Sequence, residues 1–386
     1  MNPENRNMIL AVTLSMAVLF GWQMLVVGPE LEKEAAMQQA IAEQEAAAAA
    51  ASGDAPLVDP DAVAVGMGTA ATGELSTSEA PPAMEAPRIV IDAPLVSGSI
   101  SLAGLRVDDI MLKAYQETQD PDSENIQFLL KTGTASPFFA EFGWASADAA
   151  QPMPKSDSVW TASSMVLLPG SPVTLTWENG NGLTFRRQLS INNDYMITVD
   201  DSVESALSVP LTLFPYGLVR RHGTPATTGI YILHEGALGV FDETLREEDY
   251  DDMRDADGGV SEIRPEMPGG WIGFTDKYWL AALLPDQAAN MNFTFKSLAG
   301  PSDRYQVDYI ASEASVLPVG GVVSSQTRLF AGAKKVSLLD GYADELGIAN
   351  FDLAIDFGWF YFLTKPFFYA INWLNSLLGN FGLAVL

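Results

Sequence analysis

Residues 351–386 read FDLAIDFGWFYFLTKPFFYAINWLNSLLGNFGLAVL, a stretch dense in aromatic side chains with a single lysine after Asp356. From Trp359 to Leu378 the polar residues fall close to one helical stripe, and apolar side chains cover most of the remaining surface. The polar stripe consists of Lys365, Asn372, Asn375 and Ser376. This pattern predicts an amphipathic helix, residues 357–378, that lies at a membrane surface with aromatic rings at headgroup depth.

The candidate membrane-interface residues lie in this helix and in an apolar segment near the N-terminus; they are Trp22, Trp359, Phe360, Lys365, Pro366 and Trp373. We expect Trp359 and Trp373 to brace the helix beside lipid, and Lys365 to extend toward the headgroups. Pro366 is compatible with the start of a helical segment or with a kink in a longer one.

A break follows the amphipathic pattern at Gly379-Asn380-Phe381-Gly382, and Leu383 to Leu386 resemble the first turn of a new apolar segment. Residues 379–386 are therefore expected to begin a second transmembrane helix. The alternative is one buried or spanning helix from Pro366 to Leu386. Three asparagines and the glycine-containing break disfavour it, because lipid-facing spans rarely contain them.

Met8 to Val27 form a run of 20 residues without a charge. As a helix this run would extend about 30 Å, the thickness of a bilayer core. Arg6 precedes it and acidic residues follow, so residues 1–28 are expected to form a transmembrane anchor with a cytoplasmic N-terminus. A cleaved signal peptide is the alternative. It fits less well because its apolar core usually spans only ~7–15 residues and is followed by a small-residue cleavage site.

Residues 29–87 have the composition of a tether. Leu31 to Ala51 are rich in Ala, Glu and Gln and should be partly helical. Ser52 to Pro87 contain no aromatic residue and cannot bury enough apolar surface to fold. Gly28 to Pro87 carry eleven acidic residues and one basic residue, a net charge of −10.

The whole chain has 386 residues and a formal net charge of −28, from 49 acidic and 21 basic side chains. This balance argues against nucleic acid as a partner, because phosphate binding needs clustered Lys and Arg. It also argues against a polybasic grip on anionic lipid. Cysteine is absent, which excludes a disulfide framework and a thiolate metal site.

From Arg88 to about Ser325 the dominant signals are those of β-strands. The hairpin signal is strongest at Glu178-Asn179-Gly180-Asn181-Gly182, because Asn and Gly accept positive φ. Strands are predicted at Arg88–Asp92, Gly98–Leu102, Leu105–Lys113, Val173–Trp177, Leu183–Ile191, Tyr195–Val203, Leu211–Leu218, Gly270–Phe274, Tyr278–Leu284, Met291–Phe295 and Arg304–Ile310. Short, closely spaced strands predict a mainly β fold, a large antiparallel sandwich over residues 88–333.

Near Lys334–Leu346 the hydrophobic period becomes helical. We therefore expect residues 334–356 to form a connecting helix and linker between the sandwich and the C-terminal membrane segment.

Three other stretches are candidate sites. Asp242 to Asp257 hold nine acidic residues, but Met253 and Arg264 stand where a calcium loop needs its first and closing ligands, so a solvated acidic loop is expected.

His222 and His234 could supply an acid–base pair, although 12 residues separate them and nothing in the pattern brings them together.

The third stretch is the aromatic segment from Gly269 to Pro285. We expect Trp271, Tyr278 and Trp279 to anchor the sandwich; an exposed aromatic groove for a peptide or sugar is the alternative. Walker, nucleophile-elbow and dinucleotide motifs are missing from the sequence. We assign no catalytic, cofactor-binding or metal-ligating residue, and we expect neither a cofactor nor enzymatic activity.

Four blocks of the sequence resemble the YidC/Oxa family of membrane-protein insertases. They are MNPENRNMILAVTLSMAVLFGWQ (1–23), GLTFRRQLSINNDYMITVDDSVES (182–205), GGWIGFTDKYWLAALLP (269–285) and the stretch 351–386 quoted above. The last block is the most specific, and the resemblance spans nearly the whole chain except the tether.

The resemblance implies an insertase and chaperone of the bacterial inner membrane, with a periplasmic β-supersandwich similar in shape to mutarotase-like domains. It implies as partners nascent membrane proteins, the Sec translocon with its accessory subunits, and the lipid bilayer. In the family a groove arginine lies farther along the second membrane helix, beyond Leu386, so no residue here takes that role and the chain is expected to be an N-terminal portion without the insertase core. A membrane-tethered periplasmic sugar- or peptide-binding module is the alternative function.

Overall fold

The computed structural model describes residues 86–120, 122–148, 151–227, 233–298, 303–358 and 361–385. The chain divides into two compact units, residues 1–62 and 63–386, and every element described below belongs to the second. The expected anchor at Met8–Val27, including Trp22, and the tether up to residue 85 lie outside the described residues.

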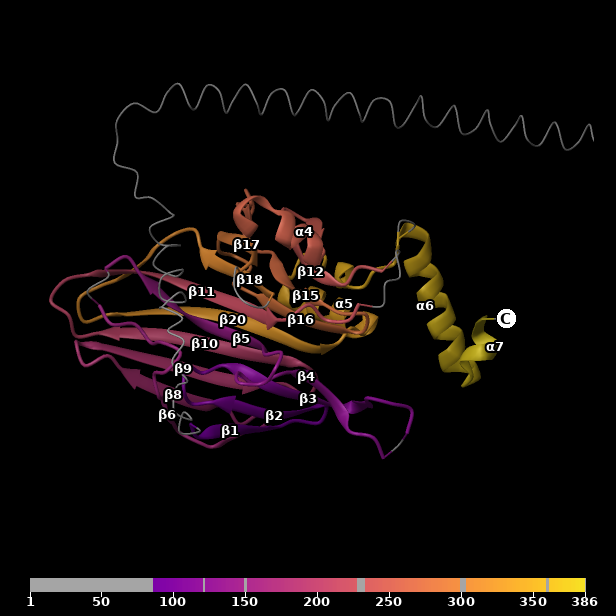
Figure 1. The fold of residues 1–386 in the computed structure, drawn as a ribbon, viewed down its shortest axis with the longest axis horizontal. Helices are drawn as coiled ribbons and strands as arrows, with labels where there is room; N and C mark the ends of the chain where they lie inside the picture. The colour runs from indigo at the N-terminus through magenta and orange to yellow at the C-terminus, as the bar shows by residue number, and fades with distance from the viewer. Residues whose placement is uncertain are drawn as a thin grey trace, which may run out of the picture. The chain divides into compact units, whose positions relative to one another are not determined.

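Two large, mainly antiparallel sheets make up most of the described part of the chain (Figure 1). The first sheet has the strand order β14-β17-β18-β11-β5-β3-β2-β1-β7, with β4 paired to β3 and β19 paired to β11. Its strands are β1 Arg88–Asp92, β2 Val96–Ser101, β3 Val107–Gln116, β4 Asn125–Leu129, β5 Phe138–Ser146, β7 Val166–Leu167, β11 Leu211–His222, β14 Val260–Ile263, β17 Met291–Ser297, β18 Arg304–Ala311 and β19 Ser315–Leu317.

The second sheet has the order β13-β12-β15-β16-β20-β10-β9-β8-β6. Its strands are β6 Thr161–Ala162, β8 Val173–Glu178, β9 Leu183–Ile191, β10 Met196–Ser205, β12 Gly236–Phe241, β13 Thr244–Glu248, β15 Trp271–Thr275, β16 Trp279–Leu284 and β20 Val322–Ala333. The two sheets meet where β11 packs on β16 and β15 packs on β18, and one continuous apolar core lies between them.

Alternation along the strands explains why they form this sandwich. In β9 the odd-numbered side chains from Leu183 to Ile191 are buried, while Arg186 and Gln188 are exposed. The predicted hairpin between β8 and β9 is confirmed, since the two strands pair antiparallel. Its turn uses Gly180 and Gly182 at φ 72° and 93°, values that favour glycine.

The structure corrects the expectation for the aromatic segment at one residue. Trp271 is fully buried, and Trp279 is partly buried with its ring edge-on to Tyr115 at 4.9 Å between centroids. Tyr278 does not anchor the core, because its side chain is 59% exposed. It lies in the tight turn between β15 and β16, where the Asp276 N–H donates to the Trp279 carbonyl.

The acidic stretch is also more ordered than expected. Thr244–Glu248 form the edge strand β13, and Tyr250–Asp255 form the short helix α4, followed by the 3-10 turn η2 at Asp257–Gly259. The side chain of Asp249 caps α4 by accepting from the N–H groups of Asp251 and Asp252. Tyr250 and Met253 are buried, so one face of this helix belongs to the core although the loop sequence is highly charged.

The chain leaves the sandwich through helices at the end of β20. The expected helical segment is confirmed as α5, Val336–Leu346, which ends at Gly347 in the left-handed conformation. The 3-10 turn η3, Phe351–Ala354, packs against α5. Helix α6 spans Tyr361–Leu378 and contains Pro366 within it, and α7 spans Phe381–Val385.

The single helix from Pro366 to Leu386, considered as an alternative, is contradicted. Gly379 takes φ 65° and the helix breaks there, because the left-handed conformation cannot continue an α-helix. Phe381 already belongs to α7, so the break is shorter than the four residues expected from the sequence.

Candidate functional site

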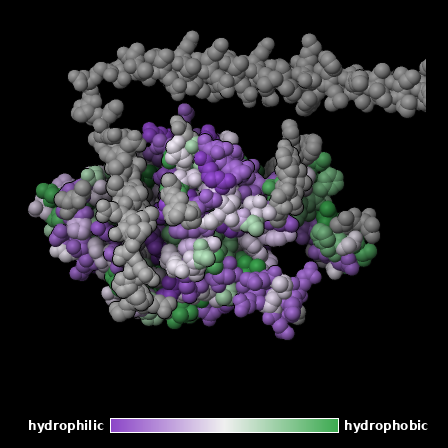
Figure 2. All heavy atoms as spheres, viewed as in Figure 1, coloured by the Kyte–Doolittle hydropathy of each residue, from purple (hydrophilic) through white to green (hydrophobic). Residues whose placement is uncertain are grey.

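Helices α6 and α7 carry an exposed apolar surface, whereas α4 and α5 bury one face in the core. The apolar side chains of α6 and α7 gather at one end of the view in Figure 2, where hydrophobic colour covers the surface. At 40–68% exposure they are Leu363, Phe367, Phe368, Tyr369, Trp373, Leu377, Leu378, Phe381 and Leu383. Exposed aromatic and aliphatic side chains at this density are a hallmark of an interaction surface.

The helical spacing also places polar residues along one side of α6, with Tyr369 of the exposed set among them. At 100° per residue, Lys365, Tyr369, Asn372 and Ser376 lie on one side of α6, while Phe367 and Leu374 lie on the opposite side. The structure therefore contains a helix at the expected position, and the residues along it keep the expected polar and apolar sides. The part of the interface around Trp359 and Phe360 lies outside the described residues.

Lys365 fixes the polar side of α6 to the sandwich. Its Nζ lies 2.5 Å from Oδ2 of Asp352 in η3 and 3.2 Å from Oδ1 of Asp340 in α5, and only 18% of its side chain is exposed. The hydroxyl group of Tyr369, one turn farther along α6, donates a hydrogen bond to Oδ2 of Asp340. Lys365 was expected to extend toward lipid headgroups; in the structure its ammonium instead lies between two carboxylates of the folded domain.

A polar groove surrounds these contacts. It lies between α5, η3 and α6, and it is lined by Asp340, Asp344, Asn350, Asp352, Lys365 and Tyr369 among others. Two carboxylates, those of Asp340 and Asp352, pair with the Lys365 ammonium and supply its counter-charge. Local sequence patterns do not predict this arrangement, because Asp340 and Asp352 are 25 and 13 residues away from Lys365.

Pro366 and Trp373 lie on one flank of α6, between its polar and apolar sides. Pro366 lies inside α6 and is exposed, and Trp373 is 65% exposed. Within the described segments, every helix is too short or insufficiently apolar to cross a bilayer.

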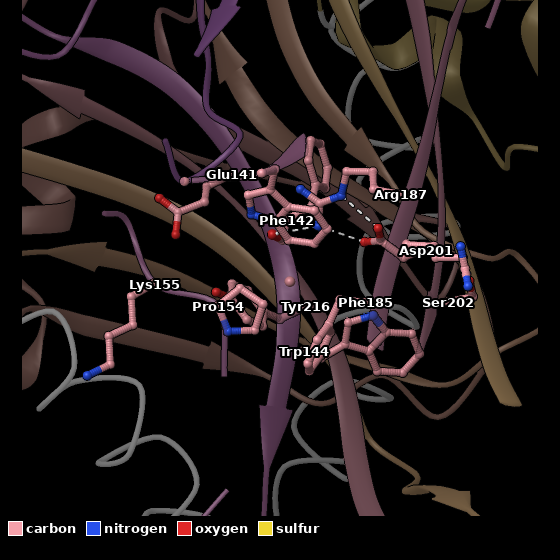
Figure 3. Close-up of a pocket in the computed structure, with 14 residues that line it drawn as sticks. Glu141, Phe142, Trp144, Pro154, Lys155, Phe185, Arg187, Asp201, Ser202 and Tyr216 are labelled. Carbon is pink, nitrogen blue, oxygen red and sulfur yellow. Dashed lines mark hydrogen bonds and ion pairs between the residues drawn. The ribbon is translucent and has the colours of Figure 1, made fainter. Parts of the chain in front are cut away.

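A second cavity lies inside the sandwich, around the buried pair Arg187 and Asp201 (Figure 3). Arg187 Nε and Nη2 donate to the two carboxylate oxygens of Asp201 at 2.6 and 2.8 Å, and Nη2 also donates to the Phe142 carbonyl at 2.8 Å. Burial lowers the pKa of Arg187, but the Asp201 charge outweighs it and the net pKa is raised.

Aromatic rings complete this cavity. The guanidinium of Arg187 lies 5.9 Å from the Phe142 ring centre and 5.7 Å from that of Trp160. Glu141 and Lys155 line the cavity on the side away from Asp201 in Figure 3. Because the buried charges neutralise each other and the rings fill the space around them, this feature acts as a structural polar core.

The two histidines do not form the acid–base pair considered from the sequence. His222 lies at the end of β11 with its ring 6.2 Å from the Phe139 ring, whereas His234 Nε2 lies 2.9 Å from the Ala237 carbonyl oxygen. Burial and then the charges of Arg220, Arg304 and Arg106 lower the pKa of His222. Among the described residues neither imidazole forms an ion pair with a carboxylate.

The acidic stretch has no arrangement of ligands around a common centre. In the described part of the chain, no group of three or more acidic or histidine side chains could hold a metal ion. Asp249 uses its carboxylate as a helix cap, and Asp251 pairs with Arg254.

Comparison with known proteins identifies the family. Residues 88–370, from the first residue of β1 into α6, match the family described as the YidC periplasmic domain. The chain belongs to this family. The match extends past the sandwich and covers the positions of Asp340, Asp352 and Lys365.

Curated relatives match over the full chain. The membrane protein insertase YidC of Beijerinckia indica is 42% identical over 390 residues, a region that is 100% of this chain and 64% of the relative. The protein of the same name from Methylobacterium sp. strain 4-46 is 42% identical over 409 residues. The matched region is 100% of this chain and 65% of that relative. The chain thus spans somewhat less than two thirds of the length of these relatives.

A solved structure is also similar. The galactose mutarotase related enzyme of Lactobacillus acidophilus has 8% sequence identity and a TM-score of 0.43, covering 63% of this chain and 97% of the other.

Proposed function

We propose that this chain serves membrane-protein insertion in the bacterial inner membrane, holding a periplasmic domain against the bilayer through α6. The observation that carries the proposal is the division of α6, whose polar side is bound to the domain through Lys365 while its apolar side is exposed. The relatives named membrane protein insertase YidC support this role.

The proposed layout combines this arrangement with the sequence patterns of the rest of the chain. Residues 1–28 form the transmembrane anchor, 29–87 the acidic tether, and 88–333 a periplasmic domain of the β-supersandwich type. Residues 334–356 connect it to the interfacial helix at 357–378, and 379–386 begin a second transmembrane helix. Trp22, Trp359, Phe360, Pro366 and Trp373 meet the headgroup region, where amphipathic aromatic rings are favoured.

Lys365 has a different role in this layout. Its ion pairs with Asp340 and Asp352 set the rotation of α6 about its own axis, so that Phe367 and Leu374 point away from the domain and toward lipid. The helix then occupies the interface beside the place where clients enter the bilayer. Transfer of polar flanks across hydrocarbon costs several kcal/mol per unpaired group, and a hydrated path next to a disturbed interface lowers that cost.

The proposed partners are nascent membrane proteins, the Sec translocon with its accessory subunits, and the lipid bilayer; nucleic acid is not among them. No catalytic step is part of the proposal. A sugar- or peptide-binding module is less favoured, because the relatives are insertases and the Arg187 cavity is filled by its own side chains.

The orientation of α6 can be tested directly because the chain contains no cysteine. Single spin labels at Phe367→Cys and Asn372→Cys probe opposite sides of the helix in the chain reconstituted into phospholipid vesicles. We expect the label at 367 to be accessible to oxygen and protected from a water-soluble nickel complex, and the label at 372 to show the reverse. Equal accessibility at the two positions would refute a lipid-facing α6.

A further inference from the structure

The tight turn between β15 and β16 carries an exposed aromatic side chain. Tyr278 is 59% exposed, although β15 before it is entirely buried and β16 after it is buried from Leu280 onward. The Lys277 ammonium lies 5.0 Å from the centre of the Tyr278 ring. A single exposed ring needs no partner, but this ring belongs to a longer row of contacts.

The row crosses from one sheet to the other. The Tyr278 ring lies 6.1 Å from the Trp279 ring, which meets Tyr115 of β3 edge-on at 4.9 Å between centroids. The Lys335 ammonium lies 5.8 Å from the centre of the Tyr115 ring. Lys277, Tyr278, Trp279, Tyr115 and Lys335 therefore form one continuous band, with a lysine at each end and three rings between them. All five residues are at least partly exposed.

The two lysines of the band have no carboxylate partner within the described part of the chain, although the net charge of the whole chain is −28. The adjacent carboxylate of Asp276 pairs with Arg221 instead. Four lysines elsewhere in the described segments do pair with carboxylates, and they are Lys113, Lys131, Lys296 and Lys365. The ammonium groups of the band are therefore available to an anionic group of a partner.

The band lies at the end of the sandwich from which the C-terminal helices emerge. The N–H of Lys334 donates to the Tyr278 carbonyl at 3.0 Å, and Lys335 is the N-cap residue of α5. Asp340 of α5 binds Lys365 of α6, and Figure 1 shows α6 next to α5 at this end. The 11 residues of α5 span about 16 Å. One short helix thus connects the band to the exposed apolar surface of α6.

The composition of the band matches the headgroup region of a phospholipid bilayer. Trp and Tyr rings are enriched there, because they place an apolar body toward hydrocarbon and a polar atom in water. Lysine side chains extend their ammonium groups into the same region. Protein–protein interfaces match less well, because lysine is depleted in them.

The chain next to the band determines which lipid group it meets. The loop that follows Tyr115, between β3 and β4, carries the acidic residues Glu117, Asp120, Asp122 and Glu124. These charges disfavour a membrane with a strongly negative surface. The phosphate group of a zwitterionic phospholipid is the anionic group that fits both the lysines and this loop.

We propose that the band is a second membrane contact, in which the three rings lie at headgroup depth and the ammonium groups of Lys277 and Lys335 bind lipid phosphates. This contact deepens the proposed function and rests on it, because α6 brings the bilayer to this end of the sandwich. Contact at α6 alone would leave the domain free to tilt about that helix. A second contact, one helix length away, fixes the tilt of the sandwich over the membrane.

The depth of single sites can be measured in the full chain reconstituted into phosphatidylcholine vesicles. Spin labels are placed at Tyr278→Cys in the band, at Phe367→Cys on α6 and at Asn181→Cys, an exposed position between β8 and β9. We expect the ratio of accessibility to oxygen over accessibility to a water-soluble nickel complex to be lowest at Asn181→Cys, intermediate at Tyr278→Cys and highest at Phe367→Cys. Equal ratios at Tyr278→Cys and Asn181→Cys would overturn the second contact.

The label on α6 separates failure of the band from failure of the proposed function. If Phe367→Cys reports lipid while Tyr278→Cys reports the same ratio as Asn181→Cys, α6 meets the bilayer and the band does not. If all three labels report the same ratio, neither surface meets the bilayer.

Matched lysine variants test the role of the ammonium groups. With the label at Tyr278→Cys, the double variant Lys277→Gln, Lys335→Gln should lower the ratio toward that of a site in water and leave the α6 label unchanged. Lys113→Gln, Lys131→Gln removes two lysines that pair with carboxylates and should change neither ratio. Equal effects of the two double variants would refute phosphate binding by the band.

Near-UV circular dichroism checks that the lysine variants are folded. If the double variant of the band is unfolded, Lys335→Gln alone gives the same test, because this lysine is exposed and lies at the end of the band away from the β15–β16 turn. An unchanged ratio at Tyr278→Cys in folded Lys335→Gln would likewise refute phosphate binding.

Discussion

The Arg187–Asp201 pair shows how single residues decide whether this core forms. Both side chains are almost fully buried, and their attraction offsets the loss of hydration only because two hydrogen bonds join them and a third reaches the Phe142 carbonyl. The alternation of buried and exposed residues along β9 places Arg187 on the inward side. A charged residue at such a position departs from the usual pattern of inward apolar side chains.

Removing one partner of this pair should therefore be severe. We expect Asp201→Asn to lower the free energy of unfolding by about 3–5 kcal/mol, because an unpaired guanidinium remains buried. Urea unfolding followed by near-UV circular dichroism measures the loss. Asp200→Asn is the control, since Asp200 accepts only an exposed hydrogen bond from Gln326. Equal stability of the two variants would contradict a structural role for the pair.

Lys334 makes stability depend on pH. Burial lowers its pKa from 10.5 to about 8, although Asp276 and Asp356 act in the opposite direction, and Nζ donates to Thr275 at 2.7 Å. Because the folded pKa lies below the unfolded pKa, the unfolded chain binds more protons between these values. The free energy of unfolding therefore rises with pH across this window.

We expect the gain from this residue to be about 2 kcal/mol between pH 7.5 and 9.5. Urea titrations of the parent and of Lys334→Met at the two pH values isolate the contribution of Lys334 to the free energy of unfolding, because other groups titrate alike in both proteins. Lys335→Met provides a control one position away, at an exposed residue. The same pH slope in the parent and in Lys334→Met would disprove the effect.

At the scale of elements, the predictions that succeeded rested on clear periodicity or turn chemistry. Strands β1 and β9 were predicted at their observed bounds, and α5 within two residues of its start. Strand β12 was missed because all six of its residues are buried, which removes the alternation that identifies a strand. Strand β20 was missed because two valines at its start are followed by five polar residues, Ser324 to Arg328, yet it is central in its sheet.

Two glycines show what packing adds to an element. A Cβ at Gly332 in β20 would lie 2.2 Å from Cγ of Tyr195, whereas one at Gly341 in α5 would meet nothing within 4 Å. We expect Gly332→Ala to destabilise the chain by about 1–3 kcal/mol. Gly341→Ala should stabilise it by about 0.5–1 kcal/mol, since alanine favours a helix interior. The midpoints of urea unfolding measure both changes in stability. If both variants were stabilised, or both destabilised, the packing argument would be contradicted.

At the scale of the molecule, the contact between α6 and the domain rests on few groups. Lys365 and Tyr369 reach Asp340 and Asp352, while most of the large apolar side chains of α6 are exposed. This geometry would allow the domain to orient the helix without burying it. The expected membrane-interface role of α6 remains a prediction, and the structure adds the contacts that would fix its rotation.

Loss of the ammonium should therefore loosen α6. Spin labels at Ser337→Cys in α5 and Ser376→Cys in α6 report the distance between the two helices by pulsed electron resonance. We expect Lys365→Met to broaden the distance distribution and Lys113→Met, which removes an exposed pair with Asp92, to leave it unchanged. An unaltered distribution in Lys365→Met would mean that these ion pairs do not hold the helix.

The sequence by itself determined the mainly β class, the hairpin at Glu178–Gly182, the connecting helix and the amphipathic division of α6, because each depends on residues within one or two turns of each other. Only the tertiary structure decided that Tyr278 is exposed, that Lys365 is held by Asp340 and Asp352, and that Tyr115 lies between Trp279 and Lys335. These facts depend on strand order and on contacts between residues far apart in the chain. Local patterns carry no information on such contacts, because periodicity fixes the face of a residue but not the residue it meets.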